Sequence, residues 1–279
     1  MDWLFAPWSY EFMSLALIGG ILVGILCPVV GSYLIVQRMA LLGDVVAHAV
    51  LPGLAIANFL RLPLLVGAFA FGLLSSFVTH WIQSQSRVKV DTAMAITFSS
   101  FFSLGIALLT ALNSRLALEE LLFGDILSVA AADVVQIGAI TLVLLIAIRL
   151  FYKELLFFTF DPLGAEAVGL PVNLMNFGLM AGITLAIIAG MKMVGVILVI
   201  ALMITPAATA YLLVRQLHWM MGIGAALGAT ASGVGMYLSY YLNMPSGPAI
   251  ALTSFGLFLL TLLFSPSQGI LTRPRQGEG

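Results

Sequence analysis

Residues 194–214 read VGVILVIALMITPAATAYLLV and contain no charged side chain. An α-helix of about 20 apolar residues is long enough to span a hydrocarbon core of roughly 30 Å. The stretch therefore predicts a helix that crosses a lipid bilayer. If other stretches repeat this pattern, the fold is that of an integral membrane protein.

The pattern does recur along the chain. Nine apolar segments can be drawn, at residues 13–36, 41–60, 64–83, 92–112, 131–152, 172–191, 194–214, 218–242 and 246–265. The 279 residues are 62% hydrophobic and only 8% charged, whereas soluble domains carry roughly 25% charged residues. We expect one all-α integral membrane domain over residues 1–279. It would be a polytopic helical bundle of about nine transmembrane helices, with eight or ten as alternatives, and a polar C-terminal tail at residues 272–279.

The distribution of Lys and Arg predicts how the bundle is oriented. With nine crossings and the N-terminus outside, the inner side holds eight basic residues: Arg38, Arg87, Lys89, Arg149, Lys153, Arg215, Arg273 and Arg275. The outer side holds Arg61, Arg115 and Lys192. Because cytoplasmic loops carry the excess of positive charge, the C-terminus is expected in the cytoplasm.

One segment does not fit the simple pattern. Residues 113–130 are amphipathic and include Glu119, Glu120 and Asp125. They predict either an external helix or a re-entrant piece. Their acidic side chains form a solvated loop face or, as the alternative, a patch that attracts cations.

Two ionisable residues lie inside a predicted membrane helix. A carboxylate near the centre of such a helix costs roughly 2.5–3.5 kcal/mol. Counted from Gln37 at ~1.5 Å per residue, Asp44 lies ~10 Å and His48 ~16 Å along the helix, near mid-depth. Their i, i+4 spacing places both side chains on one helix face. One oxygen ligand and one nitrogen ligand suit Mn²⁺, Fe²⁺ or Zn²⁺, so the pair is the candidate metal site.

Two ligands alone make a weak site. A second copy of the pair across a dimer axis would strengthen it, and weak or shared binding is what transport requires because the ion must also leave. The alternative is that Asp44 and His48 only pair with each other and hold helices together.

Two prolines mark predicted irregularities in the helices. Pro52 has no N–H, so the carbonyl of His48 is expected to lose its helical partner and remain free to bind water or the ion. Pro206 predicts a kink in segment 194–214. Both prolines are candidate residues along an ion path.

The longest inward connection runs from Tyr152 to Pro171. Asp161 followed by Pro162 is a good N-cap and first helical residue, and Gly169 with Pro171 are stop signals. We expect a short cytoplasmic helix within residues 161–170. From the residues alone, an ordinary connecting helix remains the alternative to a functional one.

Several function classes lack their signatures in the sequence. The net charge of −1 gives no indication of nucleic-acid binding. None of the three lysines belongs to a G-x-x-x-x-G-K-[ST] phosphate loop, so ATP hydrolysis of that kind is not expected in this chain. There is no H-E-x-x-H metalloprotease motif, and Leu41-Leu42-Gly43-Asp44 lacks the first glycine of the G-x-G-D pattern of membrane aspartyl proteases. An intramembrane enzyme is therefore a minor hypothesis.

The stretch from Gly43 to Gly53, which reads GDVVAHAVLPG, resembles the membrane permease subunit of ABC transporters for manganese, zinc and iron. Three more stretches agree in order and spacing: Phe123-Gly124-Asp125, Leu202–Ala210 (LMITPAATA), and Pro245-Ser246-Gly247-Pro248. The resemblance runs over nearly the whole chain.

The resemblance implies a bacterial cytoplasmic-membrane importer with several partners. These are a second copy of the chain, two ATP-binding subunits on the cytoplasmic side and an extracytoplasmic metal-binding protein. It implies that Asp44 and His48 line the ion path at the homodimer interface. It also implies that Asp161, Ala165, Glu166, Ala167 and Gly169 belong to the helix that couples the permease to the ATPase. No permanently bound cofactor is implied, only the transported Mn²⁺, Zn²⁺ or Fe²⁺ and the ATP on the partner.

An ATP-independent secondary transporter or channel for divalent cations is the competing class. The Asp and His ligands do not choose among the three metals, so the physiological ion stays open.

Overall fold

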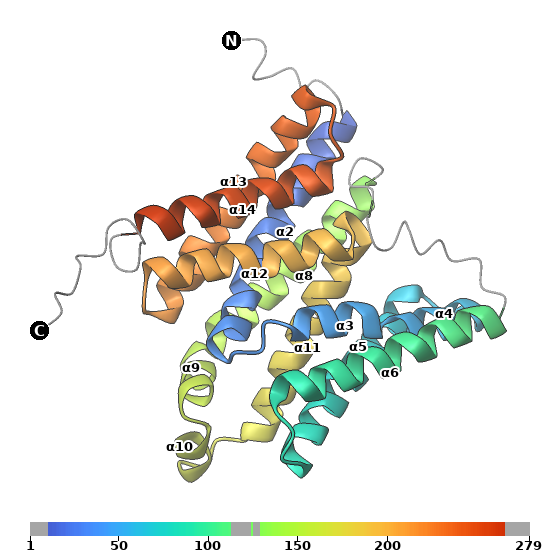
Figure 1. Ribbon diagram of the computed structural model, residues 1–279, viewed down its shortest axis with the longest axis vertical. Helices are drawn as coiled ribbons and strands as arrows, with labels where there is room; N and C mark the ends of the chain where they lie inside the picture. The colour runs from blue at the N-terminus through green and yellow to red at the C-terminus, as the bar shows by residue number, and fades with distance from the viewer. Residues whose placement is uncertain (1–10, 113–123, 125–128, 266–279) are drawn as a thin grey trace, which may run out of the picture.

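The computed structural model describes residues 11–112, 124 and 129–265, and these residues fold into α-helices joined by short turns (Figure 1). The helices are α2 (Glu11–Val36), α3 (Leu42–Ala49), α4 (Leu51–Phe59), α5 (Leu64–Gln85), α6 (Val90–Ala111), α8 (Ala131–Leu150), α9 (Tyr152–Phe160), α10 (Pro162–Ala167), α11 (Val172–Val194), α12 (Val196–Leu213), α13 (Leu217–Leu242) and α14 (Ser246–Phe264).

The prediction of about nine membrane-spanning helices is confirmed. Within the described residues, nine spans are long and apolar enough to cross a bilayer, and α3 and α4 together form one of them, Leu42–Phe59. Each span overlaps one of the predicted apolar segments, because a helix that satisfies its own backbone hydrogen bonds is the form in which an apolar chain enters lipid.

The structure differs from the predicted loop between Tyr152 and Pro171. Most of this connection is helical, since α9 fills residues 152–160 ahead of α10. Leu155 and Phe158 of α9 are buried against the bundle. Helix α9 is nine residues long, which is too short to be recognised among apolar segments of about 20 residues.

The bundle is built around α2. This helix packs against α13 and α12 on one side and against α8 and α11 on the other. A second group consists of α4, α5 and α6, and α3 connects the two groups by packing against α5, α6, α11 and α12 (Figure 1). The candidate site therefore lies on one of the helices that join the two groups, the other being α11, which packs against α5.

Close helix approach depends on glycine at two crossings. A Cβ on Gly228 of α13 would overlap the carbonyl oxygen of Gly24 in α2, and one on Gly24 would lie 2.6 Å from Gly228 O. Gly53 of α4 and Gly67 of α5 make the same kind of backbone contact. Small residues favour such packing in membranes, where helix association depends on van der Waals contact rather than on exclusion of water.

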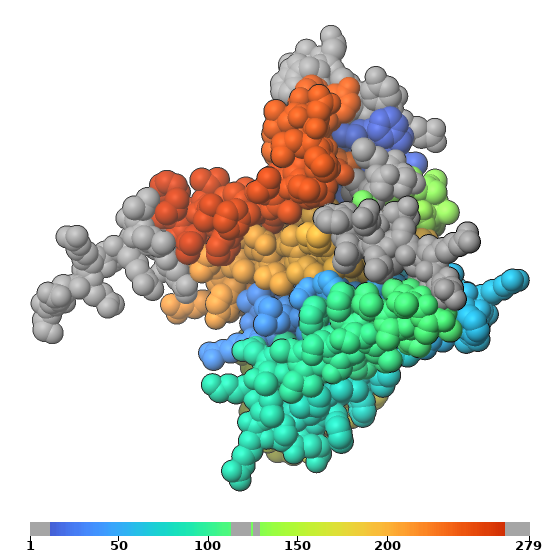
Figure 2. All heavy atoms as spheres, turned by 45° about the vertical axis from the view of Figure 1, so that its right-hand side comes forward, coloured from blue at the N-terminus to red at the C-terminus, as the bar shows by residue number. Residues whose placement is uncertain are grey.

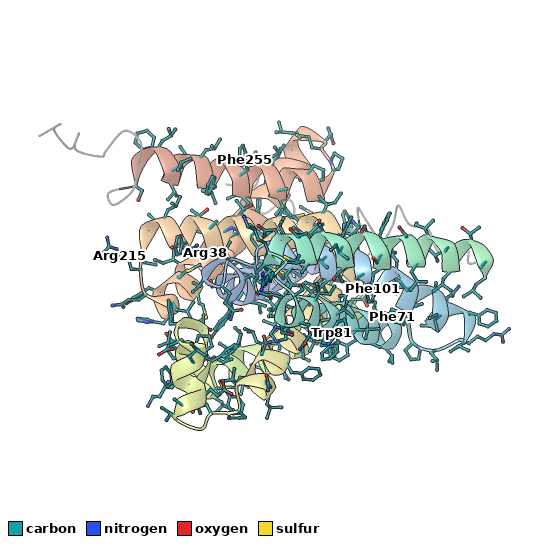
Figure 3. The ribbon with its side chains drawn as sticks, turned by 60° about the horizontal axis from the view of Figure 1, so that its bottom comes forward. Arg38, Phe71, Trp81, Phe101, Arg215 and Phe255 are labelled. Atoms are coloured by element: carbon teal, nitrogen blue, oxygen red, sulfur yellow. The ribbon has the colours of Figure 1, made fainter. Side chains whose placement is uncertain are left out.

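The ends of the helices fall on two opposite sides of the bundle, as alternating spans require. Lys192 at the end of α11 lies 2.6 Å from the Asp133 carboxylate at the start of α8, which puts these two ends on the same side. Arg38 after α2 and Arg215 after α12 lie together on one side of the bundle in Figure 3. Which side faces the cytoplasm remains a prediction from the basic residues.

Some predicted features lie outside the described residues. They are the polar tail 272–279, the acidic residues Glu119, Glu120 and Asp125, and most of segment 113–130, including the question whether it is re-entrant. Gly124 is described within that segment. It has φ +62° and packs its backbone directly on Val194 and Gly195, at the turn between α11 and α12.

We predict that Gly228→Val lowers the thermal stability of the purified protein, because the new side chain must push α2 away from α13. Overpacking of this kind costs roughly 1–3 kcal/mol. Gly233→Val is the matched control, since it places the same residue in the same helix where nothing lies within 4 Å of the added Cβ. Thermal unfolding in detergent would measure both, and equal midpoints for the two variants would contradict the assigned contact.

Candidate functional site

The candidate metal site begins where α2 ends. The N–H of Met39 donates to the Leu34 carbonyl and the N–H of Arg38 to the Ile35 carbonyl, and Arg38 has φ +58°. This is a Schellman termination, which stops a helix and turns the chain. The next helix, α3, starts only at Leu42.

The late start of α3 corrects the predicted depth of the site. Counted from Leu42 at ~1.5 Å per residue, Asp44 lies ~3 Å and His48 ~9 Å along the helix. The count from Gln37 was wrong because residues 37–41 form a turn rather than helix. Asp44 is thus in the first turn of α3, where the positive end of the helix dipole stabilises a carboxylate.

Asp44 and His48 do lie on one helix face and in contact. The Nδ1 of His48 is 3.2 Å from Asp44 Oδ1 and 3.0 Å from the Asp44 carbonyl oxygen. A carbonyl oxygen can only accept a hydrogen bond, so Nδ1 carries the proton. In the neutral ring the lone pair is then on Nε2, which makes Nε2 the nitrogen available to a metal ion.

Two phenylalanines of α6 hold the other side of the imidazole. The ring centroid of His48 is 5.2 Å from that of Phe98 and 5.9 Å from that of Phe102, both edge to face. Phe98 and Phe102 stack on each other at 5.8 Å. The imidazole is therefore oriented by Asp44 at Nδ1 and by two aromatic faces. Sequence reasoning did not identify the phenylalanines, although their i, i+4 spacing on an apolar helix was visible.

The other faces of α3 are packed against the chain's own helices. Gly43 lies beside the Sδ atom of Met203 in α12, and Val46 and Val50 lie beside Gly72 of α5. By contrast, the Asp44 side chain is 42% exposed and the His48 side chain is 19% exposed. In Figure 2 a strip of blue atoms from this part of the chain emerges between the green α6 and the amber α12.

The pair is an incomplete coordination sphere. Among the described residues no group of three or more His, Cys, Asp and Glu side chains is close enough together to hold a metal ion. One carboxylate and one imidazole nitrogen per chain can bind an ion only with help from water, backbone or another chain. The direct pairing of Asp44 with His48, which was the alternative to a metal site, is present at Nδ1 and Oδ1. It does not involve Nε2 of His48 or the second carboxylate oxygen of Asp44.

Pro52 breaks the helix as predicted. The helix is interrupted at Val50, so the span divides into α3 and α4 with Pro52 in the first turn of α4. The His48 carbonyl has no regular helical partner, because Pro52 has no N–H, and only the Val50 N–H at the break is directed toward it. Binding of water or an ion by this carbonyl stays a prediction. Pro52 packs beside Gly105 of α6.

Pro206 lies within α12 without ending it. It is buried, and its carbonyl oxygen approaches Gly224 of α13 rather than α3. The structure brings it into the α2, α12 and α13 core and does not join it to the Asp44–His48 pair. A role for Pro206 along an ion path stays a prediction.

The second candidate region is α10. Asp161 caps this helix, since its Oδ1 accepts a hydrogen bond of 2.8 Å from the Gly164 N–H. At the other end Leu170 N–H donates to Ala165 O and Gly169 N–H to Glu166 O, with Gly169 at φ +86°. These bonds form a second Schellman motif, which needs the left-handed conformation that glycine adopts without strain. Both ends of this short helix are thus held by the residues that predicted them.

The surface of α10 is divided into a packed and an open face. Ala165 is fully buried where α10 packs on α9. Glu166 and Ala167 are exposed, as are the apolar side chains of Leu163 (80%) and Val168 (73%). The helix stands outside the nine candidate membrane spans. Exposed apolar side chains that lie together in this way are typical of a surface that contacts another protein or the membrane interface.

Comparisons with known proteins agree with this arrangement. The sequence profile of the ABC 3 transport family matches residues 9–265. "Manganese transport system membrane protein MntC" of Listeria monocytogenes is 41% identical over 263 residues, which cover 94% of each chain. "Probable iron transport system membrane protein" of Haemophilus influenzae is 38% identical over 276 residues, or 99% of this chain and 98% of that one. A chain in the solved structure "PsaBC from Streptococcus pneumoniae in complex with Fab" has a TM-score of 0.86 and 40% identity, and the match covers 96% of both chains.

We predict that Asp161→Ala loosens α10 by removing its N-terminal cap. Loss of such a cap costs typically ~1 kcal/mol, which corresponds to roughly fivefold faster hydrogen exchange through local opening. The amides of residues 164–167 report this change in hydrogen–deuterium exchange. Asp161→Asn keeps an acceptor at the cap and should leave exchange nearly unchanged. Equal exchange in the alanine variant and the parent would reject the cap.

Proposed function

Since this chain belongs to the ABC 3 transport family, we propose that it provides the path by which a divalent transition-metal ion crosses the membrane. The chain is the multi-pass membrane permease of an ABC transport system and not the ATPase of that system. ABC transporters are driven by ATP, so family membership argues against the alternative of an ATP-independent transporter or channel. The proposal concerns which residues hold the ion and how the permease responds to ATP.

The observation that carries the proposal is the geometry of Asp44 and His48. The hydrogen bond at Nδ1 leaves Nε2 of His48 as a ligand, and Asp44 remains partly exposed beside it. One oxygen and one nitrogen donor per chain suit a borderline or hard divalent ion. Two chains with these residues facing each other would offer four donors, which supports a homodimer with a shared, transient site.

The metal is proposed to be manganese or iron. The names of the Listeria and Haemophilus relatives refer to manganese and to iron, respectively. A carboxylate–imidazole set accepts both ions. Zinc fits the same ligands and stays a prediction that competition in an uptake assay would test.

The energy source is proposed to act through α10. Two ATP-binding subunits would dock on the face formed by Leu163, Glu166 and Val168, and an extracytoplasmic binding protein would deliver the ion on the opposite side. Charge and apolar contact at an exposed helix are suited to a reversible protein interface. The excess of Lys and Arg supports a cytoplasmic location for this side of the bundle. Movement of α10 would reach the core through α9, which packs on α10 and continues directly from α8.

We predict that His48→Asn strongly lowers metal uptake whereas His48→Gln retains more of it. The amide of Gln reaches roughly the position of Nε2, while that of Asn reaches only the position of Nδ1. Loss of the ligand atom should lower uptake by about tenfold or more, and Asp44→Ala should have a similar effect. Uptake of radioactive manganese by cells that express the transporter measures all three variants.

His80→Gln is the matched control, because His80 is an exposed histidine of α5 without a role in the proposed site. Co-purification with the ATPase confirms that each variant is assembled. Normal uptake by assembled His48→Asn and Asp44→Ala variants would refute the proposed ion site.

We predict that Glu166→Ala weakens binding to the ATPase or the stimulation of ATP hydrolysis by about tenfold, as expected for one lost charge-assisted hydrogen bond. Asp91→Ala is the control, since Asp91 is an exposed acidic residue in the first turn of α6. Co-purification and ATPase assays on the reconstituted complex measure the effect. If Glu166→Ala behaves like Asp91→Ala in both assays, α10 does not couple the subunits through this residue.

A further inference from the structure

The contacts of the His48 imidazole divide into a polar part and an aromatic part. Within the described residues, its hydrogen-bond partners belong to Asp44, whose carbonyl oxygen and Oδ1 lie 3.0 and 3.2 Å from Nδ1. The aromatic contacts come from α6, where the ring centroids of Phe98 and Phe102 lie 5.2 and 5.9 Å from that of His48. A phenyl ring has no hydrogen-bonding atom. This flank of the imidazole therefore offers an ion no ligand, and offers the water on that ion no acceptor.

The two rings form one wall that the surrounding helices hold in place. They are nearly parallel, at 4°, with centroids 5.8 Å apart. One turn further along α6, Gly105 packs so closely on α4 that an added Cβ would lie 2.6 Å from the Cβ of Leu51. Because α6 cannot withdraw from the helix pair α3 and α4 without breaking this contact, the rings stay beside the imidazole. Phe98 and Phe102 are called the aromatic wall below.

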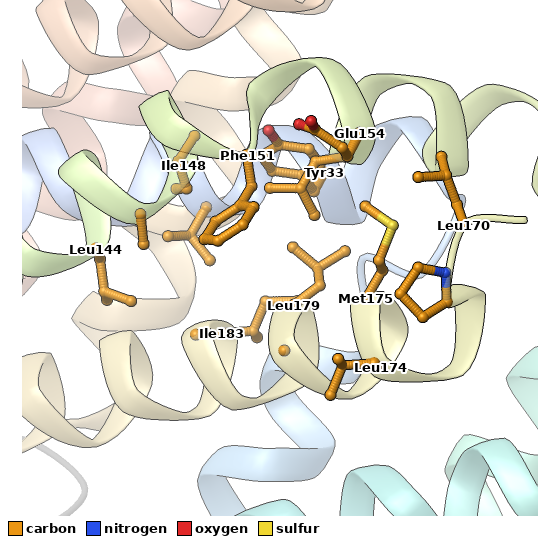
Figure 4. A pocket seen from close by; sticks show the side chains of 16 residues that line it. Tyr33, Leu144, Ile148, Phe151, Glu154, Leu170, Leu174, Met175, Leu179 and Ile183 are labelled. Carbon is orange, nitrogen blue, oxygen red and sulfur yellow. The ribbon is translucent and has the colours of Figure 1, made fainter. Parts of the chain in front are cut away.

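The ion site is not an enclosed cavity of this chain. A cavity of about 470 Å³ does lie between α2, α8, α9 and α11, but the residues that line it do not include Asp44, His48 or the aromatic wall (Figure 4). Asp44 is instead 42% exposed. A single chain thus discriminates between ions through the two ligands and the groups beside them, not through the size of an enclosing cage.

Divalent ions differ in how readily they give up water. Mg²⁺ dehydrates reluctantly and usually keeps several of its waters, whereas Ca²⁺ takes roughly 6–8 oxygen ligands. Transition-metal ions exchange water for an imidazole nitrogen more readily. A coordinated water is a strong hydrogen-bond donor, and beside a phenyl ring it loses its acceptor. The aromatic wall therefore costs a hydrated Mg²⁺ more free energy than an ion that binds Nε2 directly.

We propose that Phe98 and Phe102 are specificity-determining residues of the transport site. Their stacked rings deny hydrogen-bond acceptors to the water shell of Mg²⁺ and so favour a transition-metal ion that replaces water by the His48 nitrogen. This role rests on the proposed ion site at Asp44 and His48. It adds a source of selectivity that belongs to the permease itself and is independent of the protein that delivers the ion.

The test is equilibrium dialysis of the purified complex of permease and ATPase with radioactive Mn²⁺ and increasing Mg²⁺. ATP and the extracytoplasmic binding protein are omitted, so that the measured discrimination is that of the permease. In Phe98→Asn an amide oxygen replaces the ring and can accept from a coordinated water. We expect the ratio of the Mg²⁺ to the Mn²⁺ dissociation constant to fall by about tenfold, as for one hydrogen bond to a charged group. Phe102→Asn should act in the same direction.

Two variants separate polarity from packing. Phe98→Leu keeps the wall apolar and should retain the discrimination of the parent. Phe101→Asn is the matched control, because Phe101 is a partly buried phenylalanine of the same helix that faces Phe71 of α5, at 6.4 Å between centroids, instead of His48 (Figure 3). An unchanged ratio in both Phe98→Asn and Phe102→Asn would overturn the proposal. Equal loss of discrimination or of Mn²⁺ binding in Phe98→Leu would also overturn it, since the rings would then act only by packing.

The proposed ion site has its own control in the same experiment. Mn²⁺ binding that depends on Asp44 and His48, together with unchanged discrimination in the asparagine variants, would refute the role of the aromatic wall alone. Mn²⁺ binding that is equal in the parent, Asp44→Ala and His48→Asn would refute the ion site, and the role of the wall with it.

Discussion

The hydrocarbon interior of a bilayer offers no hydrogen-bond partner, and this constraint governs the whole structure. The backbone satisfies its own hydrogen bonds by forming a helix across each span. Many hydroxyl groups donate to a carbonyl of their own helix: Ser32 donates to Pro28 O at 2.8 Å and Thr209 to Thr205 O at 2.7 Å. Where helices pack without polar contacts, glycine lets their backbones come close together, as at Gly24 and Gly228 where α2 crosses α13.

One departure from this rule lies where function is proposed. The backbone ladder is interrupted at Val50, two residues after His48. Asp44 keeps much of its exposure while its neighbours are buried, and His48 is positioned by one hydrogen bond and two aromatic rings. An ion that must be released is better served by a half-site that is oriented but unfilled than by a closed sphere.

The connection between α8 and α11 joins these parts mechanically. Helix α9 follows α8 directly and packs on α10. Helix α10 is only six residues long and keeps its shape through the Asp161 cap and the Gly169 turn. A short helix held at both ends can move as a unit when a partner pushes on its exposed face. Such a movement would act on α9, the helix on which α10 packs, and through it on α8.

The sequence by itself determined the class of fold, the number of spans and their approximate ends. Whether a segment of about 20 residues partitions into lipid depends on its own hydropathy, which is a local property of the sequence. It also determined that Asp44 and His48 share a face and that Asp161 and Gly169 bound a helix, since these depend on spacing and local backbone geometry. Only the tertiary structure decided the start of α3 at Leu42, the aromatic faces of Phe98 and Phe102, and the position of Pro206 against α13. These features come from helices far apart in the chain, and which helix lies against which follows from how side chains and glycines fit together in three dimensions.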